Sequence, residues 1–233
     1  MKSTNKVILL FIFLCICLYG REIVSVPKWI NDFIIDMQLE HSTSVKTDND
    51  YSDILLFKNE FIGYIGNDYQ KLDVVFGDAK QISSKKYKIK GYTFTKNNKC
   101  DFEGVLEILD ERIIKEQKFG VDDYMKDKIK EQGYSIAKYE FIENTKQSAS
   151  GIFKGYAIFR WYIDKNGDLK YDNIEEDADS YSNNQFSGVW ISNKTSIEKK
   201  CAWGHYRIPN SKDLDIGAGE FSVNPKYKNN GWN

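Results

Sequence analysis

The sequence predicts a mainly β protein, an antiparallel barrel or strongly twisted sandwich, with an N-terminal helix and one further short helix. The pattern Phe-x-Gly followed by Tyr or Val occurs four times, beginning at Phe61, Phe102, Phe153 and Phe186. Phe and Gly are two positions apart and therefore share one strand face, where the glycine leaves room for a neighbouring ring or backbone and permits a bend. Repeated bending in one direction curls an antiparallel sheet into a barrel or a twisted sandwich.

Two further segments have the features of strands. Residues 86–95 alternate apolar and polar side chains over most of their length, and Tyr92 and Phe94 fall on one face. Residues 161–171 are predicted to form a hairpin, because Asn166-Gly167 supplies the positive φ angles of a tight turn. Acids and amides over 164–175 match calcium-loop positions, but the sixth position lacks glycine and strands flank the segment, so we expect a hairpin without strong calcium binding.

Two helices are expected. Over residues 27–40, apolar side chains recur at helical spacing: Trp29, Ile30, Phe33, Ile34 and Met37. Ser25 is the expected cap and Pro27 suits a first turn. The short helix is expected over 122–132, with Asp122 as its cap and Gly133 just past its end.

The N-terminus predicts export. Lys2 and Lys6 precede an apolar run of 12 residues at 7–18, which is too short to span a bilayer and matches a signal peptide over 1–20. The rest divides into residues 21–50, the helix with a polar connector, and residues 51–233, a single β-rich domain. We expect the mature chain in the periplasm or at the cell surface, without a transmembrane span. A lipid anchor is not favoured, because Cys15 and Cys17 follow large apolar residues.

Cysteine usage and charge limit the chemistry further. Removing the signal leaves Cys100 and Cys201, and an even pair in an exported chain predicts a disulfide, with two buried free thiols as the alternative. The chain has 33 Lys and Arg against 34 Asp and Glu, and this net charge of −1 does not indicate nucleic-acid binding. No His, Cys and Asp cluster has metal-ligand spacing, and residues 217–219 lack the helix that a nucleotide-binding loop requires, so neither metal nor cofactor is expected.

The densest candidate chemistry lies in residues 201–221. Trp203 and Arg207 share one strand face with His205, and a buried Arg207 needs a carboxylate, for which we expect Glu220 rather than Asp213. Asp215 is also near in sequence. The alternative is a glycan-active hydrolase that uses Glu220 with Asp213 or Asp215 as an acid pair. The structural ion pair is the favoured interpretation.

A polar rim and stacking aromatics complete the expected ligand site. The acidic run over 172–179 precedes side chains that are able to line such a rim, and tryptophans are able to stack on a ligand. The candidate ligand-binding residues are Trp190, Trp203, Tyr181, Asn184, Arg207 and Glu220.

Residues 183–190, 201–209 and 215–221, together with 61–70 and 97–102, resemble exported proteins of unknown function from Bacteroides-type bacteria. The resemblance covers most of the mature chain and implies no activity. Where Asp is expected in Trp-Gly-Asp-Tyr-Arg, this chain has His205, which argues against an essential catalytic carboxylate there. Gly188-Val189-Trp190 also resembles the Gly-x-Trp of lipocalins, which marks their first strand; here it lies near the C-terminus and implies at most a calycin-like barrel.

These observations favour a non-enzymatic β-barrel of the cell envelope. Its partner is expected to be a small ligand in the barrel mouth or a protein, for instance a delivered toxin that an immunity-type protein neutralises. The hydrolase is the alternative from a different class. Geometry separates the two, because a hydrolase needs two carboxyl groups facing one cleft, whereas a binding protein needs a cavity or an exposed patch.

Overall fold

The computed structural model describes residues 25–232. The predicted signal peptide over 1–20 and the two cysteines considered for a lipid anchor lie outside the described residues. Among residues 25–232, none of the helices is long and apolar enough to cross a membrane.

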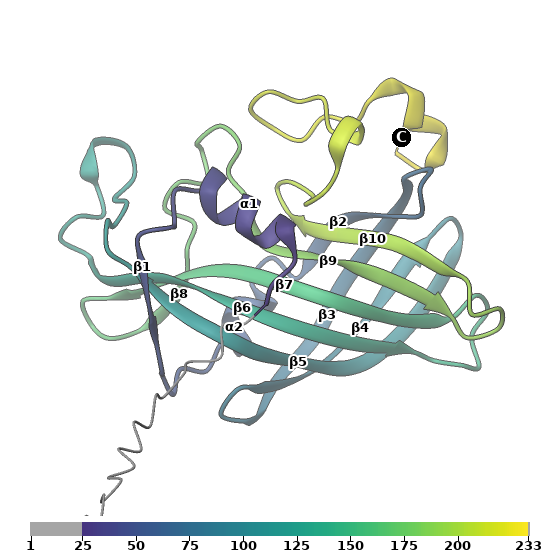
Figure 1. The fold of residues 1–233 in the computed structure, drawn as a ribbon, viewed down its shortest axis with the longest axis horizontal. Coiled ribbons are helices and arrows are strands. Elements are labelled where there is room, and N and C mark those ends of the chain that lie inside the picture. Colours follow the sequence, from purple (N-terminus) through teal and green to yellow (C-terminus); the bar gives the residue numbers. More distant parts are fainter. Residues whose placement is uncertain (1–24, 233) are drawn as a thin grey trace, which may run out of the picture.

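Eight antiparallel strands form a closed ring (Figure 1). The strands of the ring are β2 (Glu60–Ile65), β3 (Gln70–Ser83), β4 (Lys86–Thr95), β5 (Asn98–Ile114), β6 (Ile129–Glu143), β7 (Gly151–Asp164), β9 (Asn183–Ser192) and β10 (Glu198–His205). Each strand pairs with the next along the chain, and β10 returns to β2 with Cys201 opposite Ile65. The mainly β prediction is confirmed, and the ring is an up-and-down barrel.

Two short strands extend this ring. Strand β1 (Ser42–Val45) pairs with the far end of β5, beyond the reach of β4. Strand β8 (Leu169–Tyr171) pairs with β7, which confirms the predicted hairpin. In its turn Gly167 has a φ of 92°, and the Asp164 carboxylate accepts hydrogen bonds from the backbone N–H groups of Asn166 and Asp168 at 2.9 and 3.0 Å. Asp164 therefore stabilises the turn.

The repeated Phe-x-Gly pattern explains how the barrel is packed. All four phenylalanines of the pattern are buried in the barrel core. A Cβ added at Gly104 would lie 2.0 Å from the Glu140 carbonyl oxygen and 2.8 Å from the Phe141 ring. At Gly155 it would lie 2.8 Å from the Tyr139 hydroxyl. The glycines therefore admit a ring or a backbone where a side chain would prevent close approach, as the pattern predicts.

The N-terminal helix is confirmed over a shorter range. Helix α1 (Lys28–Asp36) lies across the outer wall of the barrel and buries Ile30 and Phe33 against β5, β6 and β7 (Figure 1). Pro27 is the N-cap residue of α1, and no side chain caps this helix end. The expected capping by Ser25 is therefore wrong. The helix stops because Gln38 has a φ of 56°.

The short helix expected over 122–132 is wrong. A single 3-10 turn, η1 (Val121–Asp123), occupies its start, and strand β6 already begins at Ile129. Asp122 and Asp123 have φ angles of 54° and 56°, which a continuing helix does not allow. Gly133, expected just past the helix, lies inside β6, where β5 and β7 pair with it on both sides.

The second helix lies elsewhere in the chain. Helix α2 (Ser52–Leu56) places Ile54 and Leu55 in the barrel core, beside Tyr51. After β10, the chain crosses the outside of β2 and β10 through η2 (Lys212–Leu214) and η3 (Pro225–Asn230). There Leu214 and Trp232 pack against the barrel.

The predicted disulfide is wrong. Cys100 on β5 and Cys201 on β10 are both buried free thiols. Between their strands the ring places β4, β3 and β2 on one side and β6, β7 and β9 on the other, so the two strands lie on opposite sides of the barrel. The Cys100 Sγ–H instead donates to the Ser148 carbonyl oxygen at 3.2 Å.

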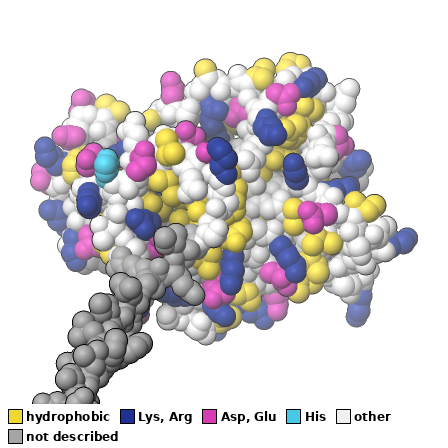
Figure 2. All heavy atoms as spheres, in the orientation of Figure 1, with side chains coloured by type: hydrophobic (Ala, Val, Ile, Leu, Met, Phe, Trp, Pro, Cys, Tyr) yellow, Lys and Arg dark blue, Asp and Glu magenta, His cyan; other side chains and the backbone are white. Residues whose placement is uncertain are grey.

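Charged side chains of both signs are scattered among hydrophobic and uncharged ones on the face that Figure 2 shows. Cross-strand pairs include Lys88 with Glu103, at 2.7 Å, and Lys154 with Glu140, at 2.9 Å. Such exposed pairs contribute little stability each. Their alternation with the buried core residues nevertheless confirms which strand face points outward.

Candidate functional site

One end of the barrel is closed. Helix α2 covers it, and the Asn184 side-chain amide donates to the Ile54 carbonyl oxygen at 2.9 Å. We call helix α2 the plug of the barrel. Behind this plug the interior is filled with aromatic rings. Trp203, for example, is 1% exposed and stacks on Phe186 with ring centroids 5.3 Å apart. The barrel is therefore a packed core and not an open channel.

The opposite end has an open mouth, which the β2–β3, β4–β5, β6–β7 and β9–β10 turns surround. It contains a cavity of about 250 Å³. The wall is apolar at Ile65, Leu72, Phe153 and Trp190, polar at Gln70, Thr93, Thr95 and Asn98, and charged at Asp68, Lys96, Glu143 and Lys199. We call this cavity the mouth pocket.

Glu143 is the central polar group of the mouth pocket. It is the last residue of β6, and its side chain is 3% exposed. Thr93 Oγ1 donates to its Oε1 at 2.5 Å, while Gly151 N and Trp190 Nε1 donate to its Oε2 at 2.8 and 2.9 Å. These donors come from β4, β7 and β9, so the carboxylate connects four strands.

The hydrogen bonds define what the Glu143 carboxylate can do. Burial raises the pKa of Glu143, and the Thr93, Trp190 and Gly151 donors oppose that effect. A carboxylate oxygen accepts two hydrogen bonds, and Oε1 receives one from within the protein. One acceptor position therefore remains on a group that borders the cavity. The Gly151 N–H and the Trp190 indole N–H can only donate, so they favour the ionised carboxylate and partly offset the rise in pKa that burial causes.

The ring of Trp190 forms the adjoining wall. Its N–H is directed to Glu143, and the Lys199 ammonium lies 5.7 Å from its ring centroid. A ligand in the mouth pocket therefore meets a fixed carboxylate, an aromatic face and two flexible lysines within one small space.

The six residues predicted to bind ligand do not share one site. Trp190 lines the mouth pocket, whereas Trp203 is buried in the core. Asn184 holds the plug at the closed end. Tyr181 is buried near that end, and its hydroxyl donates to the Asp172 carbonyl oxygen. Arg207 and Glu220 belong to the segment outside the barrel.

The expected partner of Arg207 was wrong. Arg207 Nη1 pairs with Asp215 Oδ2 at 2.7 Å, and Nη2 donates to the carbonyl oxygens of residues 217, 218 and 219. Asp215 is held from its other oxygen by the backbone N–H groups of Gly217 and Ser222. This tight loop encloses the guanidinium and leaves Glu220 exposed.

The three acids of the hydrolase alternative do not share one site. Asp215 pairs with Arg207, and the carboxylate of Asp213 binds Lys226, which lowers the pKa of Asp213. Glu220 lines a groove beside Tyr206, which neither Asp213 nor Asp215 lines. The acids that line this groove beside Glu220 are Glu176 and Asp177, and the Glu176 carboxylate binds Tyr206 and Lys58. The structure therefore does not bring together the acid pair that the alternative names.

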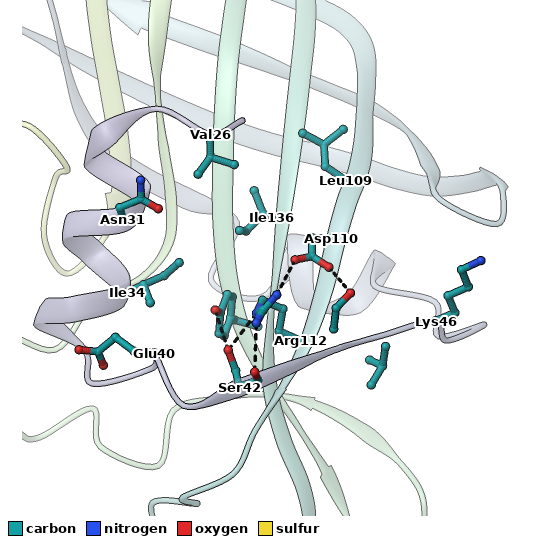
Figure 3. A pocket seen from close by; sticks show the side chains of 13 residues that line it. Val26, Asn31, Ile34, Glu40, Ser42, Lys46, Leu109, Asp110, Arg112 and Ile136 are labelled. Carbon is teal, nitrogen blue, oxygen red and sulfur yellow. Dashed lines mark hydrogen bonds and ion pairs between the residues drawn. The ribbon is translucent and has the colours of Figure 1, made fainter. Parts of the chain in front are cut away.

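A larger groove, of about 680 Å³, lies between α1, β1 and the outer wall (Figure 3). Arg112 donates to the Ser42 hydroxyl and carbonyl oxygens at 2.9 and 3.0 Å and to Asp110 at 3.1 Å. Ser44 donates to the same aspartate at 2.6 Å. These polar groups are partners of one another and fasten β1 to β5, so the smaller mouth pocket is the better candidate for a ligand site.

Glu143 was missed in the sequence, although a signal exists. Tyr139, Phe141 and Glu143 are spaced two apart and therefore share one strand face. A carboxylate that continues an aromatic strand face is costly to bury without partners. That position was therefore a candidate for a built polar site.

Comparisons of this chain with protein-family models, with curated proteins and with solved structures found no match. The chemistry of the mouth pocket is therefore the basis for assigning a function.

Proposed function

We propose that the protein is a non-enzymatic binding barrel that works outside the cytoplasm and holds a small ligand in the mouth pocket. One observation carries the proposal: the buried Glu143 carboxylate is held by three donors, has an acceptor position left and borders a cavity beside Trp190. The basic and apolar character of residues 1–20 supports the extracytoplasmic location.

The size and polarity of the pocket indicate the ligand class. Its volume of about 250 Å³ lies below the roughly 300 Å³ of the smallest drug-sized pockets. A protonated amine is the best match for Glu143, because charge-assisted hydrogen bonds are about twice as strong as neutral ones. An apolar or flat body suits the walls at Trp190 and Phe153. We infer a small organic amine.

The test is an NMR titration of the full chain with benzylamine and butylamine and with the corresponding alcohols. The indole N–H of Trp190 is the reporter, because it donates to Glu143; a Trp190→Phe variant identifies its signal. We expect saturable shifts of this signal and tighter binding of each amine than of its alcohol.

Glu143→Gln is the informative variant. The amide oxygen can accept from Gly151 and Trp190, and the amide N–H can donate to the Thr93 hydroxyl, so the fold is retained while the charge is lost. The matched control is Glu140→Gln, on the same strand but on the outer wall. Amine binding should disappear only in the first variant; equal binding in both, or no shift at Trp190 in the parent, would refute the proposal.

A further inference from the structure

A further groove outside the barrel differs from the others in charge. It has a volume of about 570 Å³ and lies between the start of α1, the outer wall at β7, β9 and β10, and the C-terminal segment. Its lining includes Lys154, Lys200 and Lys212 and no Asp or Glu. The mouth pocket and the groove at α1 and β1 both include carboxylates. We call the groove with these three lysines the lysine groove.

Two of the three ammonium groups are available to a ligand. Lys154 pairs with Glu140 at 2.9 Å. Within the part of the chain that the structure describes, neither Lys200 nor Lys212 has a carboxylate oxygen within 4.0 Å of its ammonium, and both side chains are exposed. Clustered like charges without counter-charges create a positive potential that attracts anions.

Aromatic side chains from three elements supply the apolar contacts. Trp29 comes from α1, Tyr64 from β2 and Tyr156 from β7, and Trp29 and Tyr156 are partly exposed. Such rings offer flat, amphipathic surfaces for stacking. The lysine groove therefore combines aromatic faces with open positive charge.

The closed ring narrows the choice of ligand. Strands β7, β9, β10 and β2 are paired on both sides, so a peptide cannot add a strand here and gains no backbone hydrogen bonds from the wall. A ligand with its own rings and anionic groups uses both features of the groove. We propose that the lysine groove binds an anionic oligosaccharide of the uronic-acid class, with sugar faces on Trp29 and Tyr156 and carboxylates at Lys200 and Lys212. This site is separate from the mouth pocket.

The test is calorimetric titration of the full chain at low salt with a short alginate oligosaccharide, beside a neutral maltose-series oligosaccharide of equal length. We expect binding of the acidic sugar only, weakened by added salt. The double variant Lys200→Gln and Lys212→Gln should weaken it about tenfold, because two exposed charge contacts are lost. The matched control is Lys86→Gln and Lys88→Gln, on the outer wall at β4.

Thermal melts confirm that both double variants are folded before the affinities are compared. Absence of alginate binding, or equal weakening in both double variants, overturns the proposal. A polyglutamate peptide or single-stranded DNA that binds as tightly as alginate also overturns it, because the groove would then be a general anion site.

Discussion

Acidification should destabilise the fold through one buried histidine. His205 is 4% exposed, stacks on Phe61 with ring centroids 4.3 Å apart, and has its Nδ1 3.0 Å from the Tyr171 hydroxyl. Within the described residues its Nε2 has no hydrogen-bond partner. Burial lowers the pKa of His205 to about 3. The folded protein therefore keeps this ring neutral over most of the acidic range.

The sign and size of the effect follow from proton linkage. The unfolded chain protonates a histidine near pH 6.5, whereas the folded chain does so near pH 3, so the unfolded state binds more protons between these values. The stabilisation from His205 is present above about pH 6.5 and is lost as the pH falls. Between about pH 7 and pH 4 the loss is about 3 kcal/mol, at 1.36 kcal/mol for each pH unit below the unfolded pKa.

Urea unfolding at neutral and acidic pH measures this loss. A His205→Gln variant cannot titrate, so its free energy of unfolding should fall less on acidification than that of the parent, by about 3 kcal/mol. The control is His41→Gln, at the other histidine of the chain, which is exposed. If the parent and His205→Gln lose equal stability between the two pH values, His205 is not buried in neutral form and the packing described here is wrong.

Three further predictions concern the fold. Arg207→Ala should lower the free energy of unfolding by about 3 kcal/mol, because it leaves the buried Asp215 carboxylate without its guanidinium partner. Glu220→Gln, at an exposed position, should leave the melting temperature unchanged. Equal melting temperatures for the two variants would show that the ion pair does not stabilise the fold. Gly104→Ala should lower the free energy of unfolding by about 2 kcal/mol or more, because the added methyl group overpacks the barrel. Gly77→Ala should be tolerated, because the nearest atom to its added Cβ is 3.7 Å away. Denaturant unfolding that gives both variants the same stability would contradict the described packing. Peptide mapping of the unreduced protein should find both buried thiols free, and a linked peptide would reverse that assignment.

Local patterns were sufficient to predict a mainly β fold that is either a barrel or a strongly twisted sandwich. The Phe-x-Gly pattern depends on strand geometry and on the size of glycine, both of which act between nearest neighbours in a sheet. The hairpin at Gly167 and the core of helix α1 are also encoded in a few consecutive residues. These elements are confirmed because no distant contact overrides their local preference.

Two of the main errors concern contacts between distant segments, and a third concerns the conformation of a local loop. Residues 129–132 were expected in a helix, but pairing with β7 makes them a strand. The order of strands around the ring separates Cys100 from Cys201, and spacing along the chain does not reveal that order. Asp215, and not Glu220, pairs with Arg207 because residues 215–219 form a tight loop around the guanidinium. Both acids are near Arg207 in the sequence, so the sequence alone does not tell which of them is the partner.

The mouth pocket also combines a feature that the sequence predicts with contacts that only the fold brings together. The Tyr139, Phe141 and Glu143 spacing places the glutamate on the inner face, which is a local inference. Its donors come from β4, β7 and β9, and only the closed ring brings them together. Trp190 was expected in a ligand site for its ring, whereas the structure adds its N–H as a fixed donor to Glu143.

The most direct test of ligand binding at the barrel mouth is a crystal structure of the protein with the tightest-binding amine from the NMR titration. We predict electron density in the mouth pocket, with the ammonium within hydrogen-bond distance of Glu143 Oε1 and the body of the ligand against Trp190. An empty mouth at a saturating amine concentration, or density only outside the barrel, would contradict the proposed function.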